Sequence, residues 1–212
     1  MNARIIAIAD YKGGVGKTTT AMSIAGLLAR RGEHVTLLDA DNTGGAILWE
    51  RYVSEADPDA DLGFAIDPAT AAALDPARLR QRYDGWVVID TPPSDSDTID
   101  AAIAAADLTI IPCQPSTSDM THAGKTFQEC MRRMSRPDAL FLLTRVKTNT
   151  RLAQESIAAL DGQNLPRFEN VIRERESIKQ GYGTPRFDSE YIGVVSELLE
   201  YLAAADRRNG GE

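Results

Sequence analysis

The chain has 212 residues, of which 43% are hydrophobic and 25% charged, with a formal net charge of −8. This length and apolar content suit one globular domain with a buried core, so we expect a single domain over residues 1–212. No apolar run approaches the ~20 residues of a membrane span, and no secretory signal is present, so we expect a soluble cytoplasmic protein. The acidic balance argues against a protein that binds nucleic acid over its whole surface. The two cysteines, Cys113 and Cys130, lack C-x-x-C spacing, and we expect buried thiols.

The apolar stretch 5–9 predicts the first strand, and the glycine-rich run KGGVGKT follows it at residues 12–18. A helical pattern covers 18–31, so the run lies between a strand and a helix, which is the setting of a phosphate-binding loop. Glycines let backbone N–H groups turn towards a polyphosphate, and the helix N-terminus adds a positive dipole. We therefore predict an ATP site in which Lys17 binds the β and γ phosphates and the Thr18 hydroxyl binds Mg²⁺. The predicted nucleotide contacts in this loop are Lys12, Gly13, Gly14, Val15, Gly16, Lys17, Thr18 and Thr19.

The loop departs from the ordinary pattern, G-x-x-x-x-G-K-[ST], because Tyr11 replaces its first glycine and Lys12 opens the loop. This deviant form resembles the ParA/MinD family of partitioning and positioning ATPases, whose hallmark is K-G-G-x-G-K-[ST]. The resemblance implies that Lys12 is catalytic with Lys17, and that it crosses the interface of an ATP-bound homodimer to the partner's ATP, much as an arginine finger does. The alternative is a solvated loop lysine beside an ordinary ATP site.

Paired acids close the next predicted strand, in the segment VTLLDAD at residues 35–41. Ligands of open α/β sheets gather at the carboxyl ends of strands, so Asp39 and Asp41 are both candidates for the site, and the two acids can have separate roles. The family resemblance implies that Asp41 orients the attacking water and lies at the metal, and that Asp39 lies near the metal and Lys17. The alternative is that both acids only end the strand and cap the following segment.

A helical pattern covers 46–55, whereas the segment 54–84 is rich in Ala, Asp and Pro and only loosely patterned. We interpret 54–84 as a peripheral excursion of helix and turns between strands. The continuous apolar run at 86–89, closed by Asp90, then predicts a central parallel strand buried on both faces. A carboxylate there can hold a water of the Mg²⁺ shell, so Asp90 is the Walker B candidate, and an ordinary strand end is the alternative. The sequence TPPS that follows resembles the ParA branch.

Two further apolar runs, 108–112 and 139–144, alternate with helical patterns. The helical patterns cover 98–105, 117–134, 151–160 and 189–205. This order predicts an α/β fold with a mostly parallel sheet covered by helices on both faces, as in P-loop NTPases.

Thr144 and Arg145 end the last strong strand, at the place where the family contacts adenine. The segment 114–119 resembles a stretch of small ParA proteins that lies near the dimer face of that family. From the residues alone, Ser116 or Ser118 is predicted to cap the helix that follows.

Cations are densest within 167–186, where Arg173, Arg175 and Lys179 are candidates for binding nonspecific DNA, as the resemblance implies for the ATP dimer. Glutamates interleave with them, so a self-paired solvated surface is an equal alternative. The last helical pattern is acidic on its outer face, unlike the basic membrane-binding helix of MinD-like members, so no membrane binding is expected. Because only a short stretch precedes the first strand, we expect no helix-turn-helix extension that binds an operator.

The resemblance is most specific at 12–18, 35–41 and 86–94, and it is to the small ParA class, similar to ParF-type plasmid partition proteins. It implies an ATPase that dimerises with ATP on nucleoid DNA and hydrolyses ATP when stimulated by a small ParB-like centromere-binding or adaptor protein. A metabolic enzyme with the same loop, such as a dethiobiotin-synthetase-like ligase, is the alternative from another class. The same ATPase cycle could also position another cargo, such as a microcompartment or a transfer-DNA complex.

Overall fold

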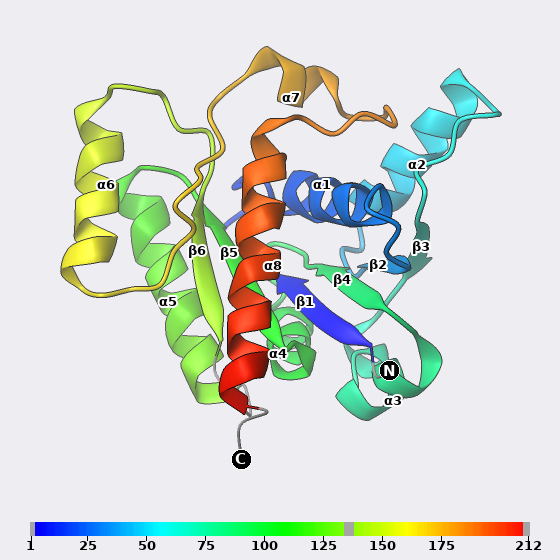
Figure 1. Ribbon diagram of the computed structural model, residues 1–212, viewed down its shortest axis with the longest axis horizontal. Helices are drawn as coiled ribbons and strands as arrows, with labels where there is room; N and C mark the ends of the chain where they lie inside the picture. The colour runs from blue at the N-terminus through cyan, green and yellow to red at the C-terminus, as the bar shows by residue number, and fades with distance from the viewer. Residues whose placement is uncertain (1–2, 134–137, 210–212) are drawn as a thin grey trace.

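A six-stranded sheet forms the centre of the computed structural model, which describes residues 3–133 and 138–209 (Figure 1). The strand order is β3-β2-β4-β1-β5-β6, and each of these pairings is parallel. The strands are β1 (Arg4–Ile8), β2 (Val35–Asp39), β3 (Ala65–Pro68), β4 (Trp86–Asp90), β5 (Leu108–Cys113) and β6 (Ala139–Leu143). The apolar runs of β2, β4, β5 and β6 are buried along their whole length, as parallel strands require. The predicted parallel sheet is therefore confirmed.

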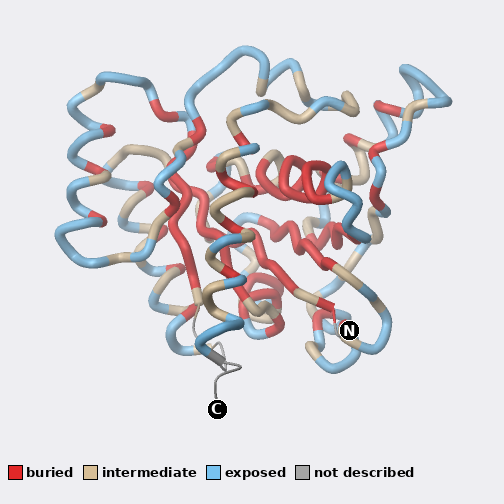
Figure 2. The backbone as a smooth tube through the Cα atoms, in the orientation of Figure 1, coloured by how far each residue is buried: buried red, intermediate tan, exposed pale blue. Residues whose placement is uncertain are grey.

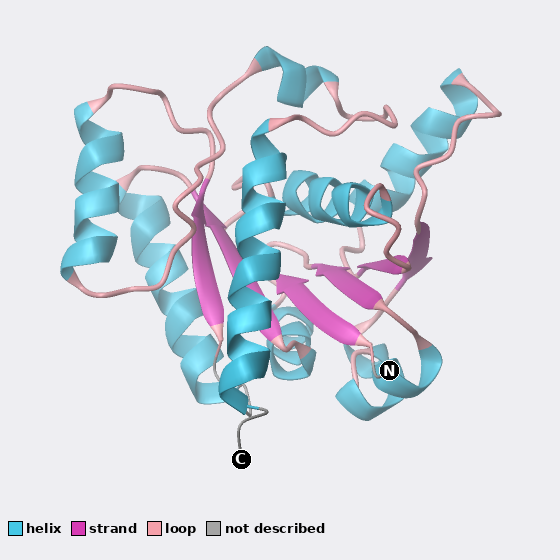
Figure 3. Ribbon diagram, viewed as in Figure 1, coloured by secondary structure: helices cyan, strands magenta, loops and turns pink. Residues whose placement is uncertain are grey.

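Helices cover both faces of the sheet (Figure 3). They are α1 (Lys17–Ala29), α2 (Gly45–Ala56), α3 (Pro76–Arg82), α4 (Ser96–Ala105), α5 (Thr117–Arg133), α6 (Arg151–Gly162), α7 (Glu176–Gln180) and α8 (Glu190–Asn209), with a 3-10 turn, η1 (Ala71–Ala73). The longer helices match the predicted ranges to within a few residues; residue 134 of the predicted 117–134 lies outside the described residues. The last helix packs on the sheet, as expected from its apolar repeat.

Alternating side chains of β1 build the two sides of the core. Ile6 and Ile8 pack with α1, α2 and α8, whereas Ile5 and Ala7 pack on the opposite face with α3 and α4. Figure 2 shows that α1 is buried along most of its length, because α8 packs across it. From Ala21 to Ala29 its sequence, AMSIAGLLA, contains one polar side chain, Ser23, in keeping with this position. The buried α1 holds the residues before it, 10–16, at the carboxyl edge of the sheet.

The segment 54–84 contains a strand that we did not predict from the sequence. β3 pairs in parallel with β2, from Thr36 opposite Ala65 to Asp39 opposite Pro68, and it forms one edge of the sheet. Its residues are exposed or half-buried, so it lacks the continuous apolar run that reveals a central strand. Pro68 is tolerated because an edge strand does not need every N–H group. The interpretation of 54–84 as helix and turns alone was therefore wrong, although α3 lies within it.

Candidate nucleotide-binding site

The glycine-rich loop connects β1 to α1 at the carboxyl edge of the sheet. Gly14 and Gly16 have φ angles of 77° and 95°, in the left-handed region that favours glycine. Gly16 occupies the N-cap of α1, and no side chain there accepts a hydrogen bond from the first turn. The N–H groups of that turn are therefore available to an anion, and the helix dipole favours one. This geometry is a phosphate cradle.

Lys17 is only 6% exposed, and its ammonium lies inside the loop. Its Nζ donates hydrogen bonds to the backbone carbonyls of Asp10 and Lys12, both at 2.9 Å. Burial lowers the pKa of Lys17, and the nearby carboxylates of Asp10, Asp90 and Asp41 oppose that shift. The structure therefore places the charge of Lys17 at the centre of the loop, as the motif predicts, among acids that exceed it in number.

Asp90 ends β4 beside the loop and is completely buried. Within residues 3–133 and 138–209, neither carboxylate oxygen has a hydrogen-bond partner. Burial raises the pKa of Asp90 to about 7, and the Thr18 hydroxyl is near enough to oppose that shift without completing a hydrogen bond of ordinary geometry. A buried carboxylate with two unpartnered oxygens needs an explanation, and a hydrated cation held between it and a hydroxyl supplies one. The residues present thus fit Mg²⁺, with Thr18 and Asp90 as its predicted holders.

Asp39 differs from Asp90, because backbone groups satisfy its carboxylate. Oδ2 accepts from the N–H groups of Ala46 and Ile47, each at 3.0 Å, and Oδ1 accepts from that of Asp41 at 3.1 Å. Burial raises its pKa, and these N–H groups oppose the shift. Asp39 therefore anchors the first turn of α2 to the end of β2. For this acid, the geometry agrees with the capping alternative.

Asp41 lies in the turn between β2 and α2. Its Oδ1 accepts from the backbone N–H and the hydroxyl of Thr43, both at 2.9 Å, and its carbonyl accepts from the N–H of Gly44 at 2.8 Å. The side chain is half-buried and close enough to influence the charges of Lys17 and Asp90. The structure thus brings Asp41 to the same edge as Lys17, Thr18 and Asp90, while its role with water stays a prediction.

Lys12 points away from the centre of its own loop. Its Nζ lies 3.6 Å from Oδ1 of Asp119 on α5, and the lysine side chain is 38% exposed. Ser116 caps α5 by accepting the N–H of Asp119 at 3.1 Å, which is one of the two caps that we predicted. The two lysines of the motif therefore take different positions, one inside the loop and one at the surface.

Asp10 is a site residue that the sequence analysis missed. It is completely buried, and its Oδ1 accepts from the N–H of Lys12 at 3.1 Å and from the Thr126 hydroxyl at 3.0 Å. Its Oδ2 has no hydrogen-bond partner among the residues that the structure describes. The signal was present in the sequence, since Asp10 is an acid just after an apolar strand, like Asp39 and Asp90. The glycine-rich motif begins at Lys12, so Asp10 lies just outside it.

A cavity of about 120 Å³ opens beside the loop, where the family resemblance placed adenine. Val15, Gly16 and Thr19 line one side, and Thr144 and Arg145 line another. The Thr144 hydroxyl donates to the carbonyl of Val15 at 2.8 Å, so this side chain supports the loop from β6. The remaining wall comes from the segment after β6 and from α7 and α8, and it includes Ile172, Ile178, Tyr182 and Tyr191. The sequence analysis did not predict the two tyrosines.

The predicted DNA-binding cations line this same cavity. Arg173 and Arg175 both pair with Glu190 of α8 at 2.6 Å. Lys179 pairs with Glu176 at 2.8 Å and with Glu174 at 3.7 Å. Each of the three is therefore ion-paired within the chain, and their role in DNA binding stays a prediction.

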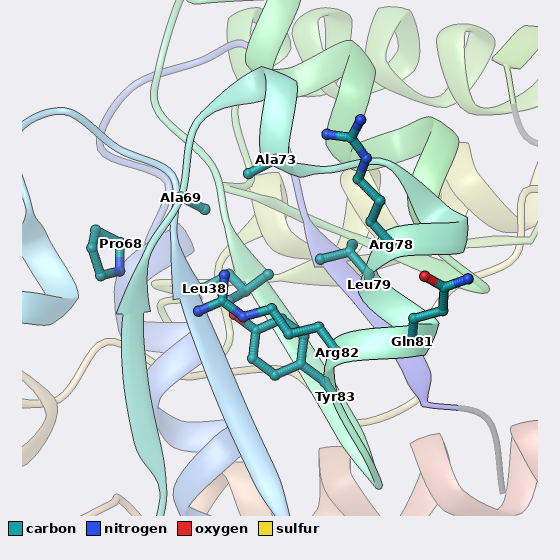
Figure 4. A pocket seen from close by; sticks show the side chains of 9 residues that line it. All are labelled: Leu38, Pro68, Ala69, Ala73, Arg78, Leu79, Gln81, Arg82 and Tyr83. Atoms are coloured by element: carbon teal, nitrogen blue, oxygen red, sulfur yellow. The ribbon is translucent and has the colours of Figure 1, made fainter.

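A separate cavity of about 450 Å³ lies between α3 and the β2–β3 edge (Figure 4). Leu38 and Leu79 are its buried apolar residues, and Arg78 and Arg82 belong to its lining. None of the predicted site residues lines it, so it is distinct from the nucleotide site.

Among the described helices, none has the length and apolar character needed to cross a lipid bilayer.

Comparisons with known proteins agree with this geometry. The sequence model of the CobQ/CobB/MinD/ParA nucleotide binding domain matches residues 6–184. The chain is 34% identical over 209 residues to the maintenance of carboxysome distribution protein A of Gloeobacter kilaueensis, covering 92% of this chain and 94% of that protein. It is 38% identical over 136 residues to the chromosome-partitioning ATPase Soj of Thermus thermophilus, covering 52% of this chain and 55% of that protein.

Solved structures share the fold at lower identity. A putative plasmid partition protein from Borrelia burgdorferi bound to AMPPNP superposes with a TM-score of 0.76 at 21% identity, covering 95% of this chain and all of that chain. The cell division ATPase MinD of Pyrococcus furiosus gives a TM-score of 0.74 at 21% identity, covering 94% of this chain and 99% of that chain. The predicted fold class is confirmed by both.

Proposed function

The chain belongs to the CobQ/CobB/MinD/ParA nucleotide-binding family, and from this premise we propose that it is a ParA-type ATPase that positions a cargo by cycling between an ATP-bound homodimer and a monomer. Residues 1–212 act as one ATPase domain in this proposal. The dimer binds nonspecific DNA, and a small ParB-like or adaptor partner stimulates hydrolysis of ATP to ADP and phosphate. The protein then works in the cytoplasm on the nucleoid, without membrane binding.

The observation that carries this proposal is the separation of the two loop lysines. Lys17 is buried on backbone carbonyls at the centre of the loop, whereas Lys12 lies at the surface on Asp119. One lysine is enough to pair with the phosphates of the subunit's own nucleotide. A second, surface lysine beside the same loop is suited to reach the phosphates of another subunit, where its charge would act in trans.

The chain's own residues divide the chemistry between them. The N–H groups of the loop and of α1 hold the phosphates, and Lys17 neutralises their charge. Thr18 and Asp90 would hold Mg²⁺, which supplies further positive charge at the β and γ phosphates. The turn that follows β2 fixes the Asp41 carboxylate near Lys17 and Asp90, where it can orient an attacking water.

The segments 144–148 and 172–179 supply the proposed DNA contact. They carry Lys147, Arg173, Arg175 and Lys179, and they meet around an open hollow of about 370 Å³ beside the nucleotide cavity. Glu190 is shared by two of these arginines, so the acids do not match the cations one for one. Two copies of this surface in a dimer would double the local charge and make DNA binding dependent on ATP and on salt.

The names of the relatives support two kinds of cargo. The relative matched over most of the chain is a carboxysome distribution protein, and the shorter match is a chromosome-partitioning ATPase. We therefore propose positioning of a cargo through an adaptor, with a plasmid, a chromosome and a microcompartment as the candidate cargoes. The separate position of Lys12 favours this switch over a dethiobiotin-synthetase-like ligase, which would activate a small carboxylate.

The test measures molar mass by light scattering with ATP, ADP or no nucleotide, together with retention on random-sequence DNA across a salt series. The wild-type protein should be a dimer that is retained on DNA only with ATP. Lys12→Ala should bind ATP and stay monomeric, while Lys125→Ala, which changes an exposed lysine on α5, should behave as wild type. A wild-type protein that is monomeric in every nucleotide state would overturn the proposal. ATP consumption that requires a small carboxylate would favour the ligase.

A further inference from the structure

The residues that open the loop are joined to α4 and α5 by their side chains. The Asp10 carboxylate accepts from the hydroxyl of Thr126, and the Tyr11 hydroxyl donates to Asp100 at 2.5 Å. Lys12 is paired with Asp119. Thr126 and Asp119 both belong to α5, so this helix contacts the loop opening at two points. The signature lysine is therefore attached to an element outside the loop.

The contact through Asp10 reaches the backbone of Lys12. Asp10 and Thr126 are both 0% exposed. Oδ1 of Asp10 accepts from the Thr126 hydroxyl at 3.0 Å and from the N–H of Lys12 at 3.1 Å, so one oxygen atom joins the helix to the lysine. The Thr126 hydroxyl also lies 3.2 Å from the carbonyl of His122, which keeps it directed along its own helix.

Stability alone does not account for a carboxylate at this position. A buried carboxylate is costly, and in the described part of the chain Oδ2 of Asp10 has no hydrogen-bond partner. Burial accordingly raises the pKa of Asp10. Lys17 interacts with this carboxylate through charge alone, because its Nζ donates its hydrogen bonds to the main-chain carbonyls of Asp10 and Lys12. The hydrogen bonds that the carboxylate does make lead to Lys12 and to α5.

We propose that Asp10 and Thr126 form a joint through which α5 sets the position of Lys12, with Asp10 as a positioning residue for that lysine. This inference rests on the proposed role of Lys12 in the ATP dimer. A shift of α5 moves the Thr126 hydroxyl, and the Asp10 carboxylate turns with it. The backbone of Lys12 then moves too, because its N–H group donates to that carboxylate. A dimer partner or adaptor that touches α5 would thereby control where the signature lysine points.

The test compares two substitutions of similar size at one position. Thr126→Val removes the hydroxyl and keeps the shape, whereas Thr126→Ser keeps the hydroxyl. Thr121→Val is the matched control, because Thr121 is an exposed threonine of α5 whose hydroxyl donates to the Thr117 carbonyl. In the nucleotide-free protein, hydrogen exchange of the Lys12 amide should be faster by roughly tenfold in Thr126→Val only.

The second measurement is the protein concentration at which ATP produces half-dimer. Thr126→Val should raise that concentration by on the order of tenfold and leave the ATP affinity of the monomer unchanged, since Lys17 keeps its own contacts. Thr126→Ser should restore it. In a Lys12→Ala background, Thr126→Val should have no additional effect.

These measurements separate the joint from the proposed function. If the Lys12 amide exchanges in Thr126→Val at the wild-type rate, the proposed joint is wrong. It is also wrong if Thr126→Val loses as much ATP affinity as it loses dimerisation. A wild-type protein that never dimerises would instead overturn the proposed function, while the exchange comparison would still decide on the joint. If Thr126→Val does not fold, Asp10→Asn and Asp10→Ala give the same comparison. The amide of Asn keeps an acceptor for Lys12 and should preserve slow exchange, and Ala should lose it.

Discussion

Asp10 and Asp90, beside the loop, and the cations of 172–190 are satisfied in opposite ways. Among the described residues, Asp90 has no hydrogen-bond partner for either carboxylate oxygen, and Asp10 has none for one of its two. Arg173 and Arg175, by contrast, both reach Glu190. Buried charges without partners are expensive, so they indicate where a ligand would complete the structure. Exposed charges that the chain pairs itself give no such indication, and the following substitutions test this difference.

The largest effect should come from Lys17→Ala. This substitution removes the one ammonium that is buried at the centre of the loop, so the phosphates would lose a charge-assisted hydrogen bond that water does not screen. We expect ATP affinity to fall by on the order of a hundredfold or more. Calorimetric titration with Mg²⁺ and ATP measures it, with Lys125→Ala as the control. An unchanged affinity would remove the nucleotide site from this loop.

Asp39→Asn should destabilise the nucleotide-free protein. The amide keeps one acceptor oxygen and brings an NH₂ group towards N–H groups that now donate to the carboxylate. We expect the free energy of unfolding to fall by about 1–3 kcal/mol, because buried N–H groups at the start of α2 lose their acceptor. Urea unfolding measures this loss. An increase in stability would mean that the Asp39 carboxylate, like that of Asp90, lacks a partner that a cation would supply.

Asp90→Asn should change the free energy of unfolding in the direction opposite to Asp39→Asn. Removing a buried charge that has no partner should raise the free energy of unfolding of the nucleotide-free protein by about 1 kcal/mol at pH 8. The same variant should lose the dependence of ATP binding on Mg²⁺. Urea unfolding of the two asparagine variants side by side checks the contrast. A loss of stability in Asp90→Asn equal to that in Asp39→Asn would contradict the distinction between the two acids.

The pH dependence of stability should report the same carboxyl group. The pKa of Asp90 is raised from 3.8 to about 7, so between these values the folded state binds a proton that the unfolded state has released. The stability that this Asp90 carboxyl group contributes is therefore fully present below pH 3.8, and it is lost as the pH rises through about 7. Asp90→Asn should reduce this slope. It should not abolish it, because burial also raises the pKa of Asp10 and Asp39. Unfolding curves from pH 5 to pH 8 would show no difference in slope if Asp90 were solvated.

The smallest effect concerns the paired cations. Glu190→Gln removes the acid that Arg173 and Arg175 share, so both guanidinium groups become free to meet phosphates. Retention on nonspecific DNA with ATP should improve by roughly two- to threefold and depend more steeply on salt. Glu200→Gln, an exposed acid on the same helix, controls for the change in net charge. Equal retention in both variants would place the DNA contact elsewhere.

The sequence predicted the features that depend on local pattern. The loop at 12–18 and the buried strands each carry a continuous signal within a few residues, and their order in the chain was enough to predict the parallel sheet. Asp90 was identified because an acid follows an apolar run. The structure added that its oxygens have no partner, which separates it from Asp39, an acid with the same sequence signal.

The features that the sequence did not predict depend on contacts between distant segments. β3 is a short edge strand whose exposed residues lack an apolar run. The Thr144 hydroxyl meets the Val15 carbonyl across 129 positions of sequence, and Thr126 meets Asp10 across 116. The pairing of Arg173 with Glu190 needs α8 to pack beside the segment after β6. Each contact exists only because the sheet and its helices bring those residues together.

The rate of ATP hydrolysis per protein molecule, measured against protein concentration with ATP and Mg²⁺ in excess, tests the central claim most directly. If the surface lysine acts on the nucleotide of a second subunit, the rate per molecule should rise with concentration in the wild-type protein and reach a plateau when the dimer is complete. It should stay low and flat in Lys12→Ala, although that variant binds ATP. A wild-type rate that is the same at every concentration, or a Lys12→Ala variant that hydrolyses ATP as fast as the wild type, would contradict the account.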